Sequence, residues 1–175
     1  MRDFYLREIS RQDQKTINEW RNNNDLISLL GAPFRYIDES IDSAWLDNYF
    51  SNRSNCVRLA VCQHGSNDII GAVYLLSIDW ISRSCEFAIW IGDVEFRGNG
   101  VGTFATEGAL KHAFLDLNLN RVYLTVLEEN EAARALYKKV GFSEEGKHRQ
   151  AVFKEGKYMN MIQMSILKNE FSLSN

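Results

Sequence analysis

Residues 95–114, EFRGNGVGTFATEGALKHAF, decide the fold of this chain. Three alternate glycines, Gly98, Gly100 and Gly102, give way at once to the apolar spacing of an amphipathic helix. Glycine costs roughly 1 kcal/mol relative to alanine inside a helix, so three of them need a physical reason. The N–H groups at a helix N-terminus bind phosphate, and glycine lets the backbone approach a bulky anion. The stretch therefore predicts a phosphate-binding turn between a strand and a helix, to which Arg97 adds a cation.

Other interpretations of this glycine turn compete with the first. The simplest is a tight turn that needs glycine for its geometry alone. A dinucleotide-binding turn requires Gly-x-Gly-x-x-Gly after the first strand and an acidic residue about 20 positions later. Here the spacing is Gly-x-Gly-x-Gly, three strands precede it, and the corresponding downstream position falls within residues 117–120, so that interpretation fails. A P-loop also fails, because no Gly-Lys-Ser/Thr follows.

Composition excludes several classes of protein. A chain of 175 residues with 45% hydrophobic residues and one proline predicts a compact fold, with residues 1–175 as a single domain. A net charge of −3 gives no basic footprint for nucleic acid. The apolar runs are shorter than the roughly 20 residues that span a bilayer, and the charged N-terminus does not resemble a signal peptide. Three cysteines without a C-x-x-C pair predict no disulfide framework and no metal site, and they favour the cytoplasm.

Hydrophobic periodicity predicts the element order β, α, α, β, β, β, α, β, α, β, β. Strands are expected at residues 4–9, 58–63, 69–78, 84–91, 121–127, 142–153 and 157–167. Helices are expected at residues 12–22, 42–50, 101–117 and 130–140, with loop or short helix at residues 21–37. The unit from residue 84 to 127 implies one parallel strand pair. The expected fold class is α+β, a mixed, mostly antiparallel twisted sheet with helices on both faces and a central strand–helix–strand unit.

Two motifs carry a resemblance to a known family. Arg97-x-x-Gly100-x-Gly102 resembles the Q/R-x-x-G-x-G/A signature of the GNAT superfamily of N-acetyltransferases, and NEAARALYKKVGF at residues 130–142 resembles its second hallmark. The order of elements also matches the family over essentially the whole chain. The resemblance implies the GNAT fold and direct transfer of an acetyl group from acetyl-CoA to a primary amine. The sequence is most similar to subgroups that acetylate ribosomal-protein N-termini, spermidine or nucleotide-linked amino sugars.

The resemblance also implies where acetyl-CoA binds. Its pantetheine arm should lie along residues 89–92 as an added strand would, so the strands at 84–91 and 121–127 must splay apart. A bulge often helps such splaying, and the sequence does not locate it. The expected cofactor-binding residues are Ile89, Trp90, Ile91, Arg97, Gly98, Asn99, Gly100, Val101, Gly102, Thr103, Asn130, Ala133 and Tyr137.

Glu86 and Tyr137 are the candidates for catalysis. A free amine is mostly protonated near neutral pH, so a base must expose its lone pair. Alternation along the strand places Glu86 on one face with Ala88 and Trp90, where a carboxylate is costly to bury unless it is compensated. Glu86 is therefore either the general base or a half-exposed, ion-paired side chain. The family places a tyrosine beside the CoA sulfur at the position of Tyr137, which implies an acid for the departing thiolate; the alternative is a core tyrosine.

The acceptor is less well defined. The resemblance implies a pocket built from the early loops, and the residues expected there are Phe34, Arg35, Tyr36, Glu39 and Trp45, together with Glu86. The acids at 38, 39 and 42 suit a polyamine but are more often a solvated helix start, whereas the aromatic residues and arginine suit a nucleotide-linked sugar. Acetylation of a ribosomal protein and a CoA-binding sensor without turnover are the alternatives. The expected partners are acetyl-CoA and an amine, without nucleic acid or membrane, and the family suggests a homodimer.

Overall fold

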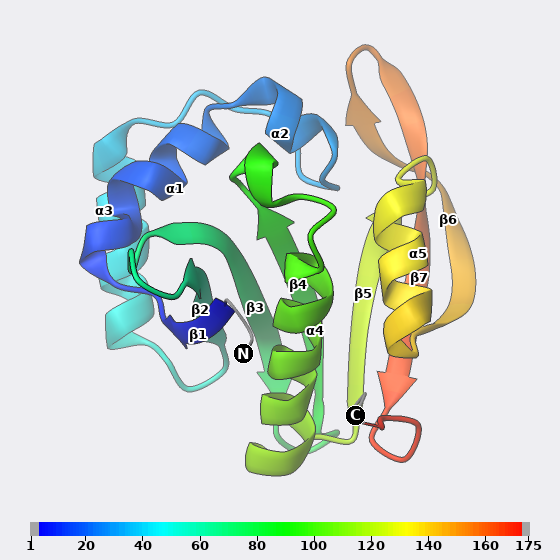
Figure 1. The fold of residues 1–175 in the computed structure, drawn as a ribbon. Coiled ribbons are helices and arrows are strands. Elements are labelled where there is room, and N and C mark those ends of the chain that lie inside the picture. Colours follow the sequence, from blue (N-terminus) through cyan, green and yellow to red (C-terminus); the bar gives the residue numbers. More distant parts are fainter. Residues whose placement is uncertain (1–3, 173–175) are drawn as a thin grey trace.

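The frame of the protein is a twisted β-sheet, shown in Figure 1 in a computed structural model that describes residues 4–172. Within that range seven strands form one sheet in the order β1-β2-β3-β4-β5-β7-β6. The strands are β1 Phe4–Glu8, β2 Val57–Gln63, β3 Ile69–Asp79, β4 Ser84–Ile91, β5 Arg121–Leu127, β6 Ser143–Lys154 and β7 Lys157–Leu167. The pair β4–β5 is parallel and the other neighbours are antiparallel, as predicted.

The helices cover both faces of this sheet. The early helices are α1 Gln14–Arg21, α2 Asn24–Ser28 and α3 Glu39–Ser51, and the later ones are α4 Val101–Lys111 and α5 Glu131–Val140. A π-helical turn, His112–Asp116, continues α4, and 3-10 turns lie at Arg11–Asp13 and Val94–Phe96. None of the helices between residues 4 and 172 is both long and apolar enough to cross a membrane.

Strand alternation divides the apolar core between the two faces. Val73 on β3 and Phe87 on β4 belong to a cluster with residues of α4 and α5. Tyr74 and Trp90, on the same two strands, pack instead with the cluster of α1, α2 and α3. Successive side chains of a strand point to opposite faces, so each of these strands supports both clusters. The predicted fold class, a mixed sheet with helices on both faces, is confirmed.

The sheet opens in its middle. β4 and β5 pair at three positions, which join Ser84–Glu86 to Arg121–Tyr123, and past Glu86 no further pair is formed within the described chain. The splay that the sequence required is therefore present (Figure 1). One of the register shifts in the sheet lies in β3, between Leu76 and Asp79, where Ser77 has φ 50°. Because Leu76 pairs with Glu86, this bulge lies beside the point of divergence.

Candidate active site

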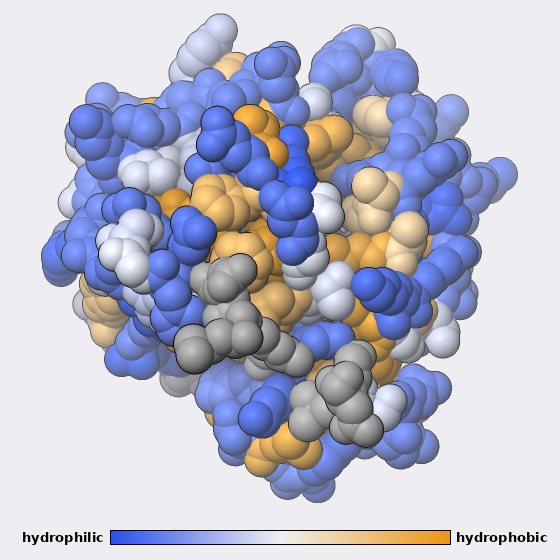
Figure 2. All heavy atoms as spheres, in the orientation of Figure 1, coloured by the Kyte–Doolittle hydropathy of each residue, from blue (hydrophilic) through white to orange (hydrophobic). Residues whose placement is uncertain are grey.

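A cleft with a volume of about 1010 Å³ opens where β4 and β5 diverge. Its walls are residues 87–91 of β4, residues 125–127 of β5, the N-termini of α4 and α5, and the segment that follows α2. Figure 2 shows apolar side chains gathered in the middle of this face, between hydrophilic flanks. Such a concave, mostly apolar cavity with a few polar groups is the usual form of a small-molecule site.

The three glycines that open α4 serve two different purposes. Gly98 and Gly100 have φ 79° and 80°, in the left-handed region that side chains other than glycine rarely adopt, and Gly100 is the N-cap of α4. Gly102 lies inside the helix, where an added Cβ would come within 2.6 Å of the Leu136 side chain. The first two glycines therefore shape the turn, and the third allows α5 to pack closely against α4. Each glycine thus has a geometric reason, and none of these reasons prevents an anion from binding at the turn.

The N-terminus of α4 and its surroundings offer positive charge and free N–H groups to the cleft. Gly98, Gly100, Val101, Gly102 and Thr103 all line it, and the first N–H groups of a helix lack intrahelical partners. Arg97, next to this turn, and Lys139 of α5 also line the cleft. Arg97 Nε and Nη2 donate to Ile91 O at 3.2 and 3.0 Å, which ties the turn to the end of β4. This arrangement suits the diphosphate of a nucleotide-like cofactor.

Asn99 is the one residue of the predicted phosphate turn that the structure places away from the cleft. Its Nδ2 donates to Glu95 O at 3.1 Å, and the residue does not line the cavity. Gly98 and Gly100 on either side of it do. A turn with left-handed residues at alternate positions sends the intervening side chain outward, so Asn99 stabilises the turn rather than facing a ligand there.

The edge of β4 that β5 has left carries backbone groups without a partner strand past Glu86, in the part of the chain that the structure describes, and Arg97 takes one of them, the Ile91 carbonyl. Gly92 donates its N–H to Ile70 O on β3 at 3.1 Å, whereas the carbonyl of Ile91 faces Arg97 instead of β3. The N–H and C=O of successive residues in a strand point to alternate edges, so those of Ile89 and Ile91 face the opening. An extended amide chain could pair with this edge as an added strand, and one N–H could polarise a thioester carbonyl.

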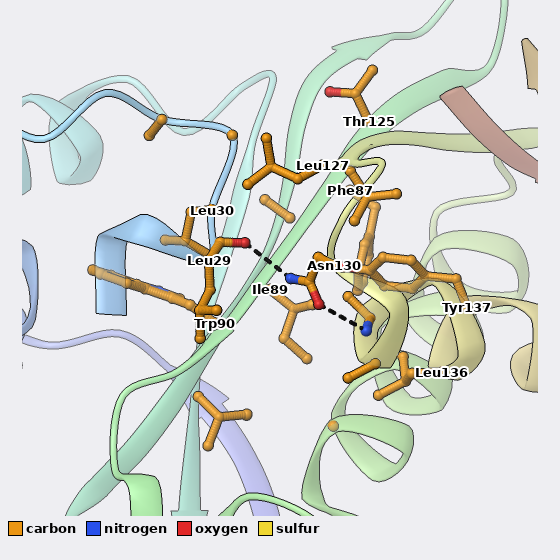
Figure 3. A pocket seen from close by; sticks show the side chains of 18 of the residues that line it. Leu29, Leu30, Phe87, Ile89, Trp90, Thr125, Leu127, Asn130, Leu136 and Tyr137 are labelled. Carbon is orange, nitrogen blue, oxygen red and sulfur yellow. Dashed lines mark hydrogen bonds between the residues drawn. The ribbon is translucent and has the colours of Figure 1, made fainter. Parts of the chain in front are cut away.

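Asn130 links the start of α5 to the segment after α2 on the other wall of the cleft. Its Oδ1 accepts from the Ala133 N–H at 3.1 Å and caps α5. Its Nδ2 donates to Leu29 O at 2.9 Å, across the cleft (Figure 3). Asn130 and Ala133 both line the cavity.

Tyr137 lines the cleft from α5, seven residues after Asn130. It is 7% exposed, and its ring meets those of Phe87 and Phe142 at centroid distances of 6.1 and 5.7 Å. Burial raises the pKa of Tyr137 well above its ordinary value, because the phenolate would lose its hydration. The phenol therefore stays protonated at neutral pH and can donate a proton or a hydrogen bond.

Glu86 lines the same cleft from the other face of β4. It is half-buried and lies at the last paired position before β5 diverges. Its neighbours on that face, Ala88 and Trp90, pack with the α1–α3 cluster, as strand alternation predicted. Tyr137 packs on the opposite face with Phe87, so a carboxylate and a phenol flank the opening between the strands.

The acceptor residues expected from the early loops lie elsewhere. Phe34, Arg35, Tyr36, Glu39 and Trp45 do not line the cleft. The rings of Phe34 and Tyr36 contact each other at 5.2 Å, and Tyr36 is 91% exposed. Trp45 is covered by the guanidinium of Arg58, 4.8 Å from its ring centroid. The loop after Pro33 turns outward, and Trp45 faces the core of the α1–α3 side instead of the cavity.

The acids at the start of α3 are used by the fold. Asp38 is the N-cap of α3 and accepts from the Ser40 N–H at 2.9 Å. Asp42 is fully buried, ion-paired with Arg21 and hydrogen-bonded by Asn18 Nδ2 at 2.7 Å. Asp38 therefore fits the helix-start interpretation. Asp42 is neither solvated nor open to a polyamine, because its carboxylate is buried against Arg21 and Asn18.

The wall opposite α4 is built by residues that the sequence did not single out. They come from the segment after α1, from β3 and from the last two strands: Leu26, Ile27, Leu29, Leu30, Gly31, Ala32, Tyr74, His148, Ala151, Val152 and Met161. The run LISLLGA at residues 26–32 is more apolar than a surface loop needs, and this was the available signal. Arg21 also lines this part of the cleft.

Comparisons with known proteins agree with this geometry. The family model of an acetyltransferase (GNAT) domain matches residues 3–143. A spermidine N(1)-acetyltransferase of Vibrio cholerae is 32% identical over 169 residues, covering 95% of this chain and 94% of that protein. A Bacillus subtilis protein named, provisionally, as a ribosomal N-acetyltransferase is 32% identical over 133 residues, 76% of this chain and 70% of its own.

The similarity extends to a solved structure. The crystal structure of a Vibrio cholerae spermidine N-acetyltransferase in complex with CoA and spermine superposes with a TM-score of 0.89 at 30% identity, covering 96% of this chain and 97% of that one. The fold, the motif-bearing turn and the sequence match thus all lead to one family. This chain belongs to the GNAT family of acetyltransferases, which use acetyl-CoA as the acetyl donor.

Proposed function

We propose that this N-acetyltransferase acetylates the primary amine of a small molecule, with polyamines as the first acceptor class. The observation that carries the proposal is one cleft that joins the N-terminus of α4 to Glu86 and Tyr137 through the gap between β4 and β5. The polyamine class is supported by the names of the Vibrio cholerae relative and its solved structure. A nucleotide-linked amino sugar has no such support, and Phe34 and Tyr36, which suggested it, do not line the cleft.

The reaction is a direct transfer in which each group has one role. The thioester carbonyl lies at the free edge of β4 and accepts a hydrogen bond from the N–H of Ile89 or Ile91. Glu86, through a water molecule, takes a proton from the ammonium, and the free amine attacks the carbonyl carbon. The tetrahedral intermediate breaks its C–S bond, and the thiolate of CoA takes the proton of Tyr137. The new amide nitrogen gives up its extra proton, which returns through water to the Tyr137 phenolate, and Glu86 releases the first proton to solvent.

One feature of the cleft limits how a polyamine binds. Among the cleft-lining residues of the described chain, Glu86 is the one carboxylate, whereas Arg21, Arg97 and Lys139 are cations. One carboxylate compensates one ammonium, so the remaining charges of a polyamine lie outside the cleft in solvent. We therefore expect similar KM values for 1,4-diaminobutane and spermidine. A site with several carboxylates would instead favour spermidine, which carries one more ammonium.

A thiol-release assay tests the proposal. Purified protein is incubated with acetyl-CoA and with spermidine, spermine, 1,4-diaminobutane or n-butylamine in turn, and free CoA is measured. Saturable thiol release with at least one polyamine is expected, and mass spectrometry of the product locates the acetyl group. Binding of acetyl-CoA without thiol release across the panel would support the sensor alternative and reject the enzyme proposal for these amines.

A second candidate is acetylation of a ribosomal-protein N-terminus. The Bacillus subtilis relative supports it by its name and by identity over 76% of this chain. The same assay distinguishes the two, because this candidate predicts thiol release with a ribosomal N-terminal peptide and none with the polyamines. A homodimer, suggested by the resemblance, is tested by sedimentation velocity against the chain mass of 20.2 kDa.

A further inference from the structure

Residues 27–32, which we name the acceptor loop, are held by hydrogen bonds from a buried lysine that lies more than 120 positions later in the sequence. Lys154 is the last residue of β6 and is 7% exposed. Its Nζ donates to Ile27 O at 2.6 Å, to Leu30 O at 2.5 Å and to Ala32 O at 2.9 Å. A lysine ammonium has three donors and no acceptor, so this single group is saturated by three carbonyls of one loop.

The burial of Lys154 is unusual for its position. β6 is exposed along most of its length, and Lys154 is its buried residue. Lysine is rarely buried unless it is paired, and burial lowers the pKa of Lys154 below its ordinary value because the ammonium loses hydration. The three carbonyls offset that cost. Removing the ammonium would leave three carbonyl groups without this donor, and unsatisfied buried polar groups are costly.

The acceptor loop forms part of the wall of the cleft that Glu86 also lines. Ile27, Leu30, Gly31 and Ala32 line the cavity on the α1–α3 side of the sheet. The loop lies close on β7, because a Cβ added at Gly31 would come within 2.6 Å of the Met161 methyl group. Figure 3 shows Leu29 and Leu30 on this wall, with Ile89 and Trp90 of β4 beside them. The position of this loop therefore sets the space left for an acceptor.

The geometry points to Lys154 as the positioning residue of the acceptor site: it fixes the acceptor loop to β6 and so determines which amines fit. Lys154 does not itself line the cleft, so it acts through the loop and does not touch the substrate. The inference rests on the proposed function, since it assigns a role toward the amine. The cofactor end has its own fastening, in which Arg97 bonds to Ile91 O, and it does not depend on Lys154.

Replacing Lys154 tests the acceptor end and the cofactor end of the cleft separately. Lys154→Met keeps the length of the side chain and removes all three donors. We expect KM for the fastest amine of the panel to rise at least tenfold, with the dissociation constant of CoA unchanged within twofold. Lys157→Met is the matched control: Lys157 lies opposite Lys154 in the same hairpin, is exposed, and pairs with Glu129 at 3.5 Å. It should leave both constants unchanged.

Hydrogen exchange measures the loop directly, without any substrate. In Lys154→Met, amides of residues 27–32 should exchange faster, while those of α4 and β3 keep their protection. Lys154→Arg keeps the charge but spreads its donors over a planar fork, so an intermediate KM is expected. If no amine of the panel reacts with the wild type, the proposed function fails, and exchange still decides whether Lys154 holds the loop.

Four results would overturn the inference. The first is an unchanged amine KM in Lys154→Met, and the second is unchanged exchange of the acceptor loop. The third is an equal loss of CoA and amine affinity, which would indicate a general structural role. The fourth is failure of both Lys154→Met and Lys154→Arg to fold, which would show that the lysine is needed for the stability of the whole protein.

Discussion

At the scale of single residues, Tyr137 makes the sharpest prediction. Its phenol is buried against Phe87 and Phe142 and is held in the protonated form by that burial. Tyr137→Phe keeps the ring packing and removes the proton, so kcat should fall about 10²-fold or more, in the range expected for general acid–base catalysis. The dissociation constant of CoA should change little. Turnover and CoA binding by calorimetry give the two numbers.

The matched control for this substitution is Tyr158→Phe. Tyr158 is 66% exposed on β7 and contacts Phe153, away from the cleft-lining residues. It should leave kcat unchanged. Equal kcat for wild type and Tyr137→Phe would show that the thiolate leaves without help from this phenol.

Single residues also show what the sequence can and cannot predict. Asn130 as a helix cap and Gly141 as a left-handed stop with φ 109° are the kind of feature that a sequence can predict, because capping depends on neighbours within a few positions. The strands expected at residues 142–153 and 157–167 leave Lys154 in the turn between them. Its burial depends on carbonyls 122–127 positions earlier in the chain, and no local pattern carries that information.

At the scale of elements, β6 depends on ionised carboxylates. Hydrogen bonds from Arg134 to Glu144 and from Ser165 to Glu145 lower the pKa of each carboxylate below its ordinary value. Lys147 of β6 likewise lowers the pKa of Glu128. A carboxylate whose pKa is depressed by folding stabilises the fold above its unfolded pKa, and that contribution is lost as the pH falls through the folded pKa.

Acid should therefore loosen β6 before the core. As the pH falls below about 4.3, the ordinary pKa of a glutamate, amides of Ser143–Lys154 should lose protection from hydrogen exchange. Amides of α4, whose residues Val101, Ala105, Ala109 and Leu110 are buried in the core cluster, should keep theirs over the same range. Exchange corrected for its intrinsic pH dependence measures both. A simultaneous loss in β6 and α4 would mean that acid acts on the whole fold.

The elements differ in how far the sequence predicted them. The strands were predicted because a two-residue period is visible even in the five residues of β1, and the longer helices because each has at least the eight residues of α1. α2 has five residues, Asn24–Ser28, too few to show a helical period, and its N-cap Asn23 accepts from the Leu26 N–H at 3.1 Å. The resemblance placed the acceptor pocket around Phe34, and no helical period drew attention to the acceptor loop that follows α2. The placement of β7 between β5 and β6 is likewise a matter of tertiary pairing, which periodicity does not report.

At the scale of the molecule, the sheet consists of two parts with one short junction. β1 to β4 form one part and β5, β7 and β6 the other, and the pairs between Ser84–Glu86 and Arg121–Tyr123 join them. Beyond Glu86, the two parts are connected by side-chain contacts such as the hydrogen bond from Asn130 Nδ2 to Leu29 O. A cofactor that pairs with β4 and contacts α5 would link the two parts, so CoA should act as a structural bridge as well as a substrate.

This bridge predicts where CoA stabilises the protein. At 100 times its dissociation constant a ligand adds about 2.7 kcal/mol of stability, which raises Tm by roughly 5–10 °C for a chain of this size. Pantetheine, which lacks the diphosphate, should raise Tm less at the same concentration because it leaves the α4 N-terminus without an anion. Exchange should slow most at residues 87–91 and 125–127, the facing walls of the gap. If CoA slows exchange in α4 but leaves exchange in β5 unchanged, the cofactor contacts only the β1–β4 part of the sheet. It would then not act as a bridge between the two parts.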